Sequence, residues 1–137
     1  MSEIIPKLLH MSGVWDVPET ENFRPRLVIN LTEQIEDSRS IQAESMIHWA
    51  IEDGDLPDTT MLHAVVDFVV AAVRAGLPTL VHCHAGLNRS GLVTALALTE
   101  LLGIDGNEAI EKLRIIRGPY VLCNRHFETY VMSIHNE

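Results

Sequence analysis

The sequence predicts an α/β fold: a single domain over residues 1–137, with a central, mostly parallel sheet of four to five strands and helices on both faces. Three observations predict it. Short apolar, β-branched segments alternate with longer helical patterns along the chain. The segment 59–75 repeats apolar residues at helical spacing. The buried-strand pattern at 79–82 passes through a short loop into a Leu- and Ala-rich helical segment at 90–102.

The first half of the chain contains the candidate strands. Residues 4–10 are apolar but interrupted by Pro6, so they predict an edge strand or an extended N-terminal segment. Residues 26–31 and 45–51 predict two further strands. Between them, residues 32–44 predict a short helix or a loop with a solvated, charged face. The charged residues assigned to that face are Glu33, Glu36, Asp37 and Arg39.

The helix predicted at 59–75 has clear boundaries. Asp58 is a suitable N-cap, because its carboxylate can accept from the first free backbone N–H groups. Gly76 suits the position after the last turn, and Pro78 prevents continuation. Its apolar face consists of Leu62, Val65, Val66, Val69, Val70 and Val73.

Two more helices follow in the last third of the chain. Asp105 and Glu108 form a capping-box pattern at the start of a helix over 107–116. Asn124 predicts the N-cap of a final helix over 125–134.

Composition limits the classes of function. The 137 residues are 47% hydrophobic, which supports a globular domain with a substantial core. No apolar run is long enough to span a membrane, and the first residues lack the pattern of a signal peptide. The formal charge of −9 disfavours broad binding to nucleic acid or to anionic membranes.

The loop between the strand at 79–82 and the helix at 90–102 predicts an anion site. A helix N-terminus presents backbone N–H groups without intrahelical partners, and its dipole favours negative charge. Gly86 allows the backbone to curl, and the guanidinium of Arg89 matches two phosphate oxygens. The same positive field favours the thiolate form of Cys83. A phosphate cradle that holds a thiolate implies nucleophilic attack on phosphorus.

The alternative interpretation is a small buried hydrophobic Cys83 beside a surface Arg89. We favour the phosphate site, because Cys83, Gly86, Arg89 and Ser90 all fall at useful spacings between a strand and a helix.

The segment His82-Cys83-x-x-Gly86-x-x-Arg89-Ser90 resembles the signature HCxxGxxR[ST] of the cysteine-dependent protein tyrosine phosphatases. The short chain looks like their dual-specificity branch, and the resemblance extends over about residues 27–127.

The resemblance implies a catalytic role for four residues of this signature. Cys83 forms a phosphocysteine, Arg89 binds the phosphate and the transition state, and Ser90 assists the departing thiolate. His82 helps to hold the loop and to tune the cysteine. The phosphate-binding loop comprises His84, Ala85, Gly86, Leu87, Asn88 and Arg89.

The resemblance also implies that no metal or other cofactor takes part. The expected partner is a phosphorylated protein or peptide. No membrane partner is expected, and the acidic charge disfavours a nucleic-acid partner. Because the chemistry needs a free thiol, we expect a reducing cytoplasm.

A phosphocysteine enzyme needs a general acid from a separate loop. The acidic, turn-forming loop at 52–58 resembles the W-P-D-x-G-x-P loop of classical tyrosine phosphatases in placing Asp53 four residues before Pro57, although the Trp and the first Pro are absent. Asp53 lies 30 positions before Cys83, so it is the predicted acid; Asp55 is the alternative.

Other substrates and another class of function stay open. The segment Gly86-Leu87-Asn88-Arg89-Ser90-Gly91 also resembles the loop of cysteine-dependent RNA 5′-triphosphatases. A phosphoinositide phosphatase is a weaker alternative, because the loop lacks lysine. A non-catalytic phosphate-binding module is disfavoured, because both Cys83 and Arg89 are present.

Three further residues have two interpretations each. Cys123 is either a buried structural cysteine, which we favour, or a reversible disulfide partner of Cys83. Arg114 and Arg117 either stabilise a helix C-terminus, which we favour, or contact an anionic substrate.

Overall fold

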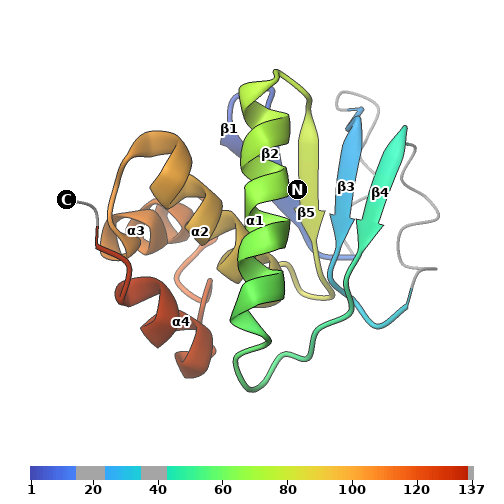
Figure 1. Cartoon of the computed structure of the whole chain (residues 1–137). Helices are drawn as coiled ribbons and strands as arrows, with labels where there is room; N and C mark the ends of the chain where they lie inside the picture. The colour runs from blue at the N-terminus through green and yellow to red at the C-terminus, as the bar shows by residue number, and fades with distance from the viewer. Residues whose placement is uncertain (15–23, 35–42, 136–137) are drawn as a thin grey trace.

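The computed structural model describes residues 1–14, 24–34 and 43–135 (Figure 1). One five-stranded sheet has the order β1-β2-β5-β3-β4. Its strands are β1 (Ser2–Ile5), β2 (Leu9–Ser12), β3 (Leu27–Asn30), β4 (Ser45–His48) and β5 (Thr79–His82). Only β1 runs antiparallel to its neighbour; β2, β5, β3 and β4 are mutually parallel. The predicted α/β class with a mostly parallel sheet is therefore confirmed.

The N-terminal segment differs from the prediction of one strand over 4–10. It forms two strands, β1 and β2, joined by a turn in which Lys7 has a φ of 65° and Leu8 N donates to Ile5 O at 3.0 Å. Pro6 cannot donate to a strand ladder, so the chain turns there. The consequence is that β2 becomes an interior strand, paired with β5.

Four helices follow the predicted pattern, with ends shifted by one or two residues. They are α1 (Thr59–Arg74), α2 (Arg89–Leu102), α3 (Gly106–Arg117) and α4 (Arg125–Met132). The three predicted N-caps are confirmed: side-chain oxygens of Asp58, Asp105 and Asn124 accept from backbone N–H groups of α1, α3 and α4. None of the helices within the described ranges is long and apolar enough to cross a membrane.

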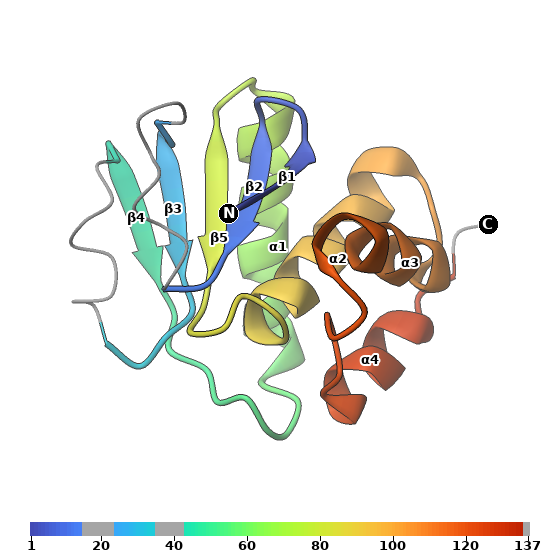
Figure 2. The same cartoon turned by 180° about the vertical axis from the view of Figure 1, so that it is seen from behind.

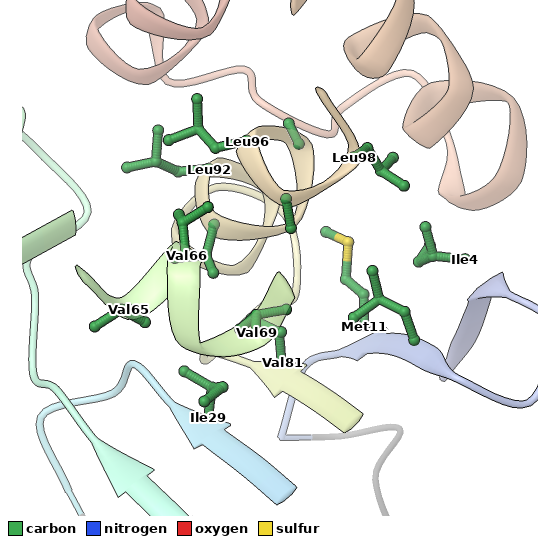
Figure 3. Close-up of a cluster of buried hydrophobic side chains, with 14 of the residues drawn as sticks. Ile4, Met11, Ile29, Val65, Val66, Val69, Val81, Leu92, Leu96 and Leu98 are labelled. Atoms are coloured by element: carbon green, nitrogen blue, oxygen red, sulfur yellow. The ribbon is translucent and has the colours of Figure 1, made fainter. Parts of the chain in front are cut away.

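The main core lies between the sheet and the helices α1 and α2 (Figure 3). The sheet contributes Met11, Val81 and Ile29, against which Val69 of α1 and Leu98 of α2 pack. The opposite face contributes a second, small cluster of Val28 and Leu80. In Figure 2 no helix of the described ranges lies over that face, so helices are observed on one face only within those ranges.

The sheet register places one edge under the site. Ser12 and Asn30 are both paired with His82, so β2, β3 and β5 end at the same level. Strand β4 ends at His48, before the predicted residue 51, although Ile51 N still donates to Leu31 O. The segments that follow these parallel strands therefore meet at one edge, where α/β proteins bind ligands.

Candidate active site

The phosphate loop (residues 83–89) is held from outside through its carbonyl groups. His84 O accepts from Val14 N at 2.8 Å, and Leu87 O accepts from Leu122 N at 3.1 Å. Gly86 O accepts from Arg117 Nε at 2.7 Å. The carbonyls of the loop are thus directed towards the surrounding structure, which supplies their donors.

This arrangement directs the loop amides inward. In a trans peptide the C=O and the following N–H point in opposite directions, and no described peptide bond is cis. The amide of Gly86 donates to Cys83 Sγ at 3.3 Å, which places the thiol inside the loop. Helix α2 begins at Arg89, and Asn88 makes no side-chain capping hydrogen bond to it. The loop therefore lines a cradle with backbone N–H groups at a helix N-terminus, an arrangement that can bind an anion.

Cys83 and Ser90 are adjacent at the bottom of this cradle. Cys83 is 2% exposed, and its Sγ lies 3.2 Å from Ser90 Oγ. Ser90 is fully buried on the first turn of α2. His82 is also fully buried, at the end of β5, where its carbonyl accepts from Leu31 N. The predicted nucleophile, its hydroxyl neighbour and the strand-end histidine are thus brought together.

Arg89 is oriented by two acceptors on one side of its guanidinium. Its NH1 donates to Glu33 Oε1 at 2.9 Å and to Ile51 O at 3.0 Å. The Arg89 side chain is 8% exposed, while that of Glu33 is 64% exposed. The Nε–NH2 edge makes no hydrogen bond to any protein atom within the described ranges. That edge is the one that can bind two phosphate oxygens at once.

Glu33 is exposed, as expected of a solvated charge, but its carboxylate also pairs with Arg89, which the sequence did not indicate. The other charges assigned to that face, Glu36, Asp37 and Arg39, lie outside the described residues. Glu33 follows β3 closely, and a hydrogen-bonded turn supports it: Thr32 N donates to Asn30 Oδ1 at 2.9 Å. The turn places a carboxylate beside the buried guanidinium.

Arg117 supports the loop backbone, which neither interpretation of the sequence anticipated. Besides Gly86 O, its guanidinium donates to Ala85 O at 3.4 Å and to Ser2 Oγ at 3.0 Å. Arg114 supports the loop indirectly, through the segment that contains Val121 and Leu122. It donates to the carbonyls of Val121 and Leu122, and Leu122 N in turn donates to Leu87 O.

The acidic loop lies against the phosphate loop through Asp53. Asp53 Oδ2 accepts from Asn88 Nδ2 at 3.1 Å, and Asp53 Oδ1 accepts from Asn124 Nδ2 at 2.8 Å. The alternative acid, Asp55, has a 98% exposed side chain whose Oδ1 lies 3.7 Å from His126 Nε2. Geometry therefore favours Asp53 over Asp55. The same hydrogen bond directs the Asn88 side chain towards Asp53.

Cys123 is exposed, so its interpretation as a buried structural cysteine is wrong. Its Sγ lies 3.5 Å from Asn88 Nδ2, and no disulfide joins it to Cys83.

Sequence reasoning missed Gly13 and Glu33, although a pattern could have found them. A Cβ on Gly13 would lie 2.7 Å from the backbone of His84 and Ala85, so Gly13 is in close contact with the loop. Both residues follow the carboxyl ends of parallel strands, and such ends meet at one edge of a sheet.

Comparison with known proteins agrees with this geometry. Residues 10–137 match the family described as "Dual specificity phosphatase, catalytic domain". The chain is 36% identical to "Cyclin-dependent kinase inhibitor 3" of Rattus norvegicus over 72 residues. This match covers 52% of this chain and 34% of that protein. The chain is 30% identical to "Tyrosine-protein phosphatase CDC14" of Saccharomyces cerevisiae over 98 residues. This match covers 70% of this chain and 18% of that protein.

Solved structures show the same fold. Tk-PTP in its active form superposes with a TM-score of 0.73 at 23% identity, over 96% of this chain and 92% of that chain. Human DUSP28 superposes with a TM-score of 0.75 at 18% identity, over 96% and 95%. The chain spans about a third or less of the length of the two curated relatives. The match over residues 10–137 places this chain in the dual specificity phosphatase catalytic domain family.

Proposed function

We propose that this chain hydrolyses phosphate monoesters of protein or peptide substrates through a phosphocysteine at Cys83. One observation carries the proposal. The buried thiol accepts from a loop amide and lies beside Ser90 Oγ, inside a loop whose carbonyls are bonded outward. Family membership and the curated relatives named as phosphatases support the same activity.

The first step transfers the phosphoryl group to sulfur. Phosphate oxygens accept from the loop amides and from the Nε–NH2 edge of Arg89. The Cys83 thiolate attacks phosphorus in line, the S–P bond forms, and the P–O bond to the leaving group breaks. Asp53, protonated at the start, donates its proton to the leaving oxygen. The departing alcohol is neutral, and the carboxyl becomes a carboxylate.

The second step returns the enzyme to its starting state. The Asp53 carboxylate accepts a proton from water as the water oxygen attacks phosphorus. The S–P bond breaks, and the electron pair returns to Cys83 Sγ as a thiolate. Ser90 Oγ, at 3.2 Å, donates a hydrogen bond to that thiolate. In both steps, the electrostatic stabilisation of the reacting phosphoryl group comes from the loop amides and Arg89.

The substrate class follows from the relatives, and the compartment from the chemistry. A curated relative is named a dual specificity protein phosphatase, and we extend protein substrates to this chain by analogy. We infer a reducing compartment such as the cytoplasm, because an oxidised Cys83 could not attack phosphorus.

The test is hydrolysis of p-nitrophenyl phosphate in the presence of EDTA by the wild type, Cys83→Ser and Asp53→Asn. We expect metal-free turnover that Cys83→Ser abolishes. Asp53→Asn should lower the rate more for phenyl phosphate than for p-nitrophenyl phosphate, since the poorer leaving group needs the acid more. Turnover that survives Cys83→Ser would refute the mechanism. Tight vanadate binding without turnover would point to a binding module.

A further inference from the structure

Three amide and carboxyl side chains join the phosphate loop, the acidic loop and helix α4. Asn88 Nδ2 donates to Asp53 Oδ2 at 3.1 Å, and Asn124 Nδ2 donates to Asp53 Oδ1 at 2.8 Å. The third side of the triangle is a hydrogen bond of 2.9 Å from Asn124 N to Asn88 Oδ1. Asn124 Nδ2 also donates to Gly54 O at 3.0 Å. One asparagine thus contacts both the side chain and the backbone of the acidic loop.

We infer that Asn124 is a positioning residue, which holds Asp53 over the phosphate loop before substrate arrives. The inference rests on the proposed role of Asp53 as the general acid. Asp53 is exposed, and an unrestrained carboxyl there would lose conformational freedom in every catalytic cycle. Ordering it in advance removes that cost from the reaction. Asp55, two residues later, has a 98% exposed side chain, and its contact with His126 is longer, at 3.7 Å.

The fold fixes which way the Asn124 amide points. Its Oδ1 accepts from His126 N at 3.0 Å and from Phe127 N at 3.3 Å, as the N-cap of α4. Phe127 is fully buried, so the start of this helix is anchored in the core. With Oδ1 committed to the helix, Nδ2 is directed at Asp53 and Gly54. Ser and Asp also cap helices well, but neither presents an N–H donor.

Because Oδ1 caps α4 and Nδ2 contacts the acidic loop, a substitution can remove the second role and keep the first. Asn124→Ser keeps a capping oxygen and the backbone N–H that Asn88 accepts from, yet it removes the donors to the acidic loop. The matched control is Asp105→Ser, which makes an equivalent N-cap exchange on α3, where the cap accepts from Glu108 N. Thermal unfolding of both variants measures any loss of stability.

The readout is kcat/KM, which reports the step in which the acid acts, for two leaving groups. We expect Asn124→Ser to lower kcat/KM for phenyl phosphate by about tenfold or more. For p-nitrophenyl phosphate, which needs little help from an acid, the loss should stay below about threefold. Inhibition by inorganic phosphate should not change, because the phosphate loop is intact. In the Asp53→Asn background, Asn124→Ser should have no further effect.

Each outcome decides between the claims. If Asp53→Asn shows the leaving-group effect but Asn124→Ser matches Asp105→Ser, the positioning role is refuted and the proposed function stands. Equal losses for both substrates in Asn124→Ser would indicate general loop damage and would also refute it. If Asp53→Asn shows no leaving-group effect, Asp53 is not the acid, and the positioning role of Asn124 fails with it, while the role of Cys83 is tested separately by Cys83→Ser.

Discussion

Gly13→Ala should disable the site although residue 13 lies 70 positions before Cys83 in the sequence. Gly13 follows β2 and packs against the outer side of the phosphate loop. A Cβ at this position would lie 2.7 Å from Ala85 C, Ala85 O and His84 O. All three are backbone atoms, which cannot rotate away as the end of a side chain can.

The magnitude follows from these distances. Ordinary van der Waals contact begins at 3.4 Å, so the loop must move by roughly 0.7 Å. Misplacing catalytic groups by about 1 Å can lower a rate by roughly 100-fold, so we expect kcat/KM to fall by about 30- to 100-fold. Overpacking of this kind also costs about 1–3 kcal/mol of stability. The assay is metal-free hydrolysis of p-nitrophenyl phosphate, with urea unfolding of the same preparations.

The matched control is Gly54→Ala, whose added Cβ meets nothing within 4 Å. It should lower kcat/KM far less than Gly13→Ala. Wild-type kcat/KM and wild-type stability in Gly13→Ala would show that the loop does not depend on this contact, and would refute the reasoning.

Three further predictions concern Glu33, Arg117 and His10. Glu33→Ala removes a largely exposed partner of Arg89, worth about 1 kcal/mol, so inhibition by inorganic phosphate should weaken by roughly fivefold; unchanged inhibition would contradict the role of Glu33. Arg117→Met leaves the carbonyls of Gly86 and Ala85 without this donor and should cost about 1–3 kcal/mol in urea unfolding; an unchanged midpoint would count against it. Burial lowers the pKa of His10, against an opposing effect of Glu3. The unfolded chain therefore binds a proton at His10 more readily than the folded protein does. The contribution of His10 to the free energy of unfolding is full above about pH 6.5 and falls as the pH drops below it. His10→Gln should make that decline smaller, as measured by urea unfolding at about pH 7.5 and 5.5.

The local elements could be predicted from the sequence because they depend on local chemistry. The apolar spacing of α1, the caps Asp58, Asp105 and Asn124, and the strand β5 needed no long-range information. The loop between β5 and α2 was predictable for the same reason: its residues are contiguous, so their spacing alone brings them together.

The rest of the site depends on contacts between distant segments. Glu33 meets Arg89 across 56 positions, and Ser2 meets Arg117 across 115. The spacing of apolar residues along the sequence does not predict such pairs, because they follow from strand order and register. The sequence does not predict the division into β1 and β2, because the tight turn there places Lys7, not a glycine, at positive φ. Cysteines are usually buried, so the sequence favours a buried Cys123, whereas the turn before α4 leaves it exposed.

The most direct test of the central claim is to trap the covalent intermediate. The wild type and Cys83→Ser would be mixed with a radiolabelled phosphate monoester in EDTA and quenched in acid within one turnover, and the labelled peptide would be identified by mass spectrometry. The mechanism predicts one labelled phosphoryl group on Cys83 in the wild type, and none on the protein in Cys83→Ser. Rapid turnover with no label on the protein, or with the label on another residue, would contradict it.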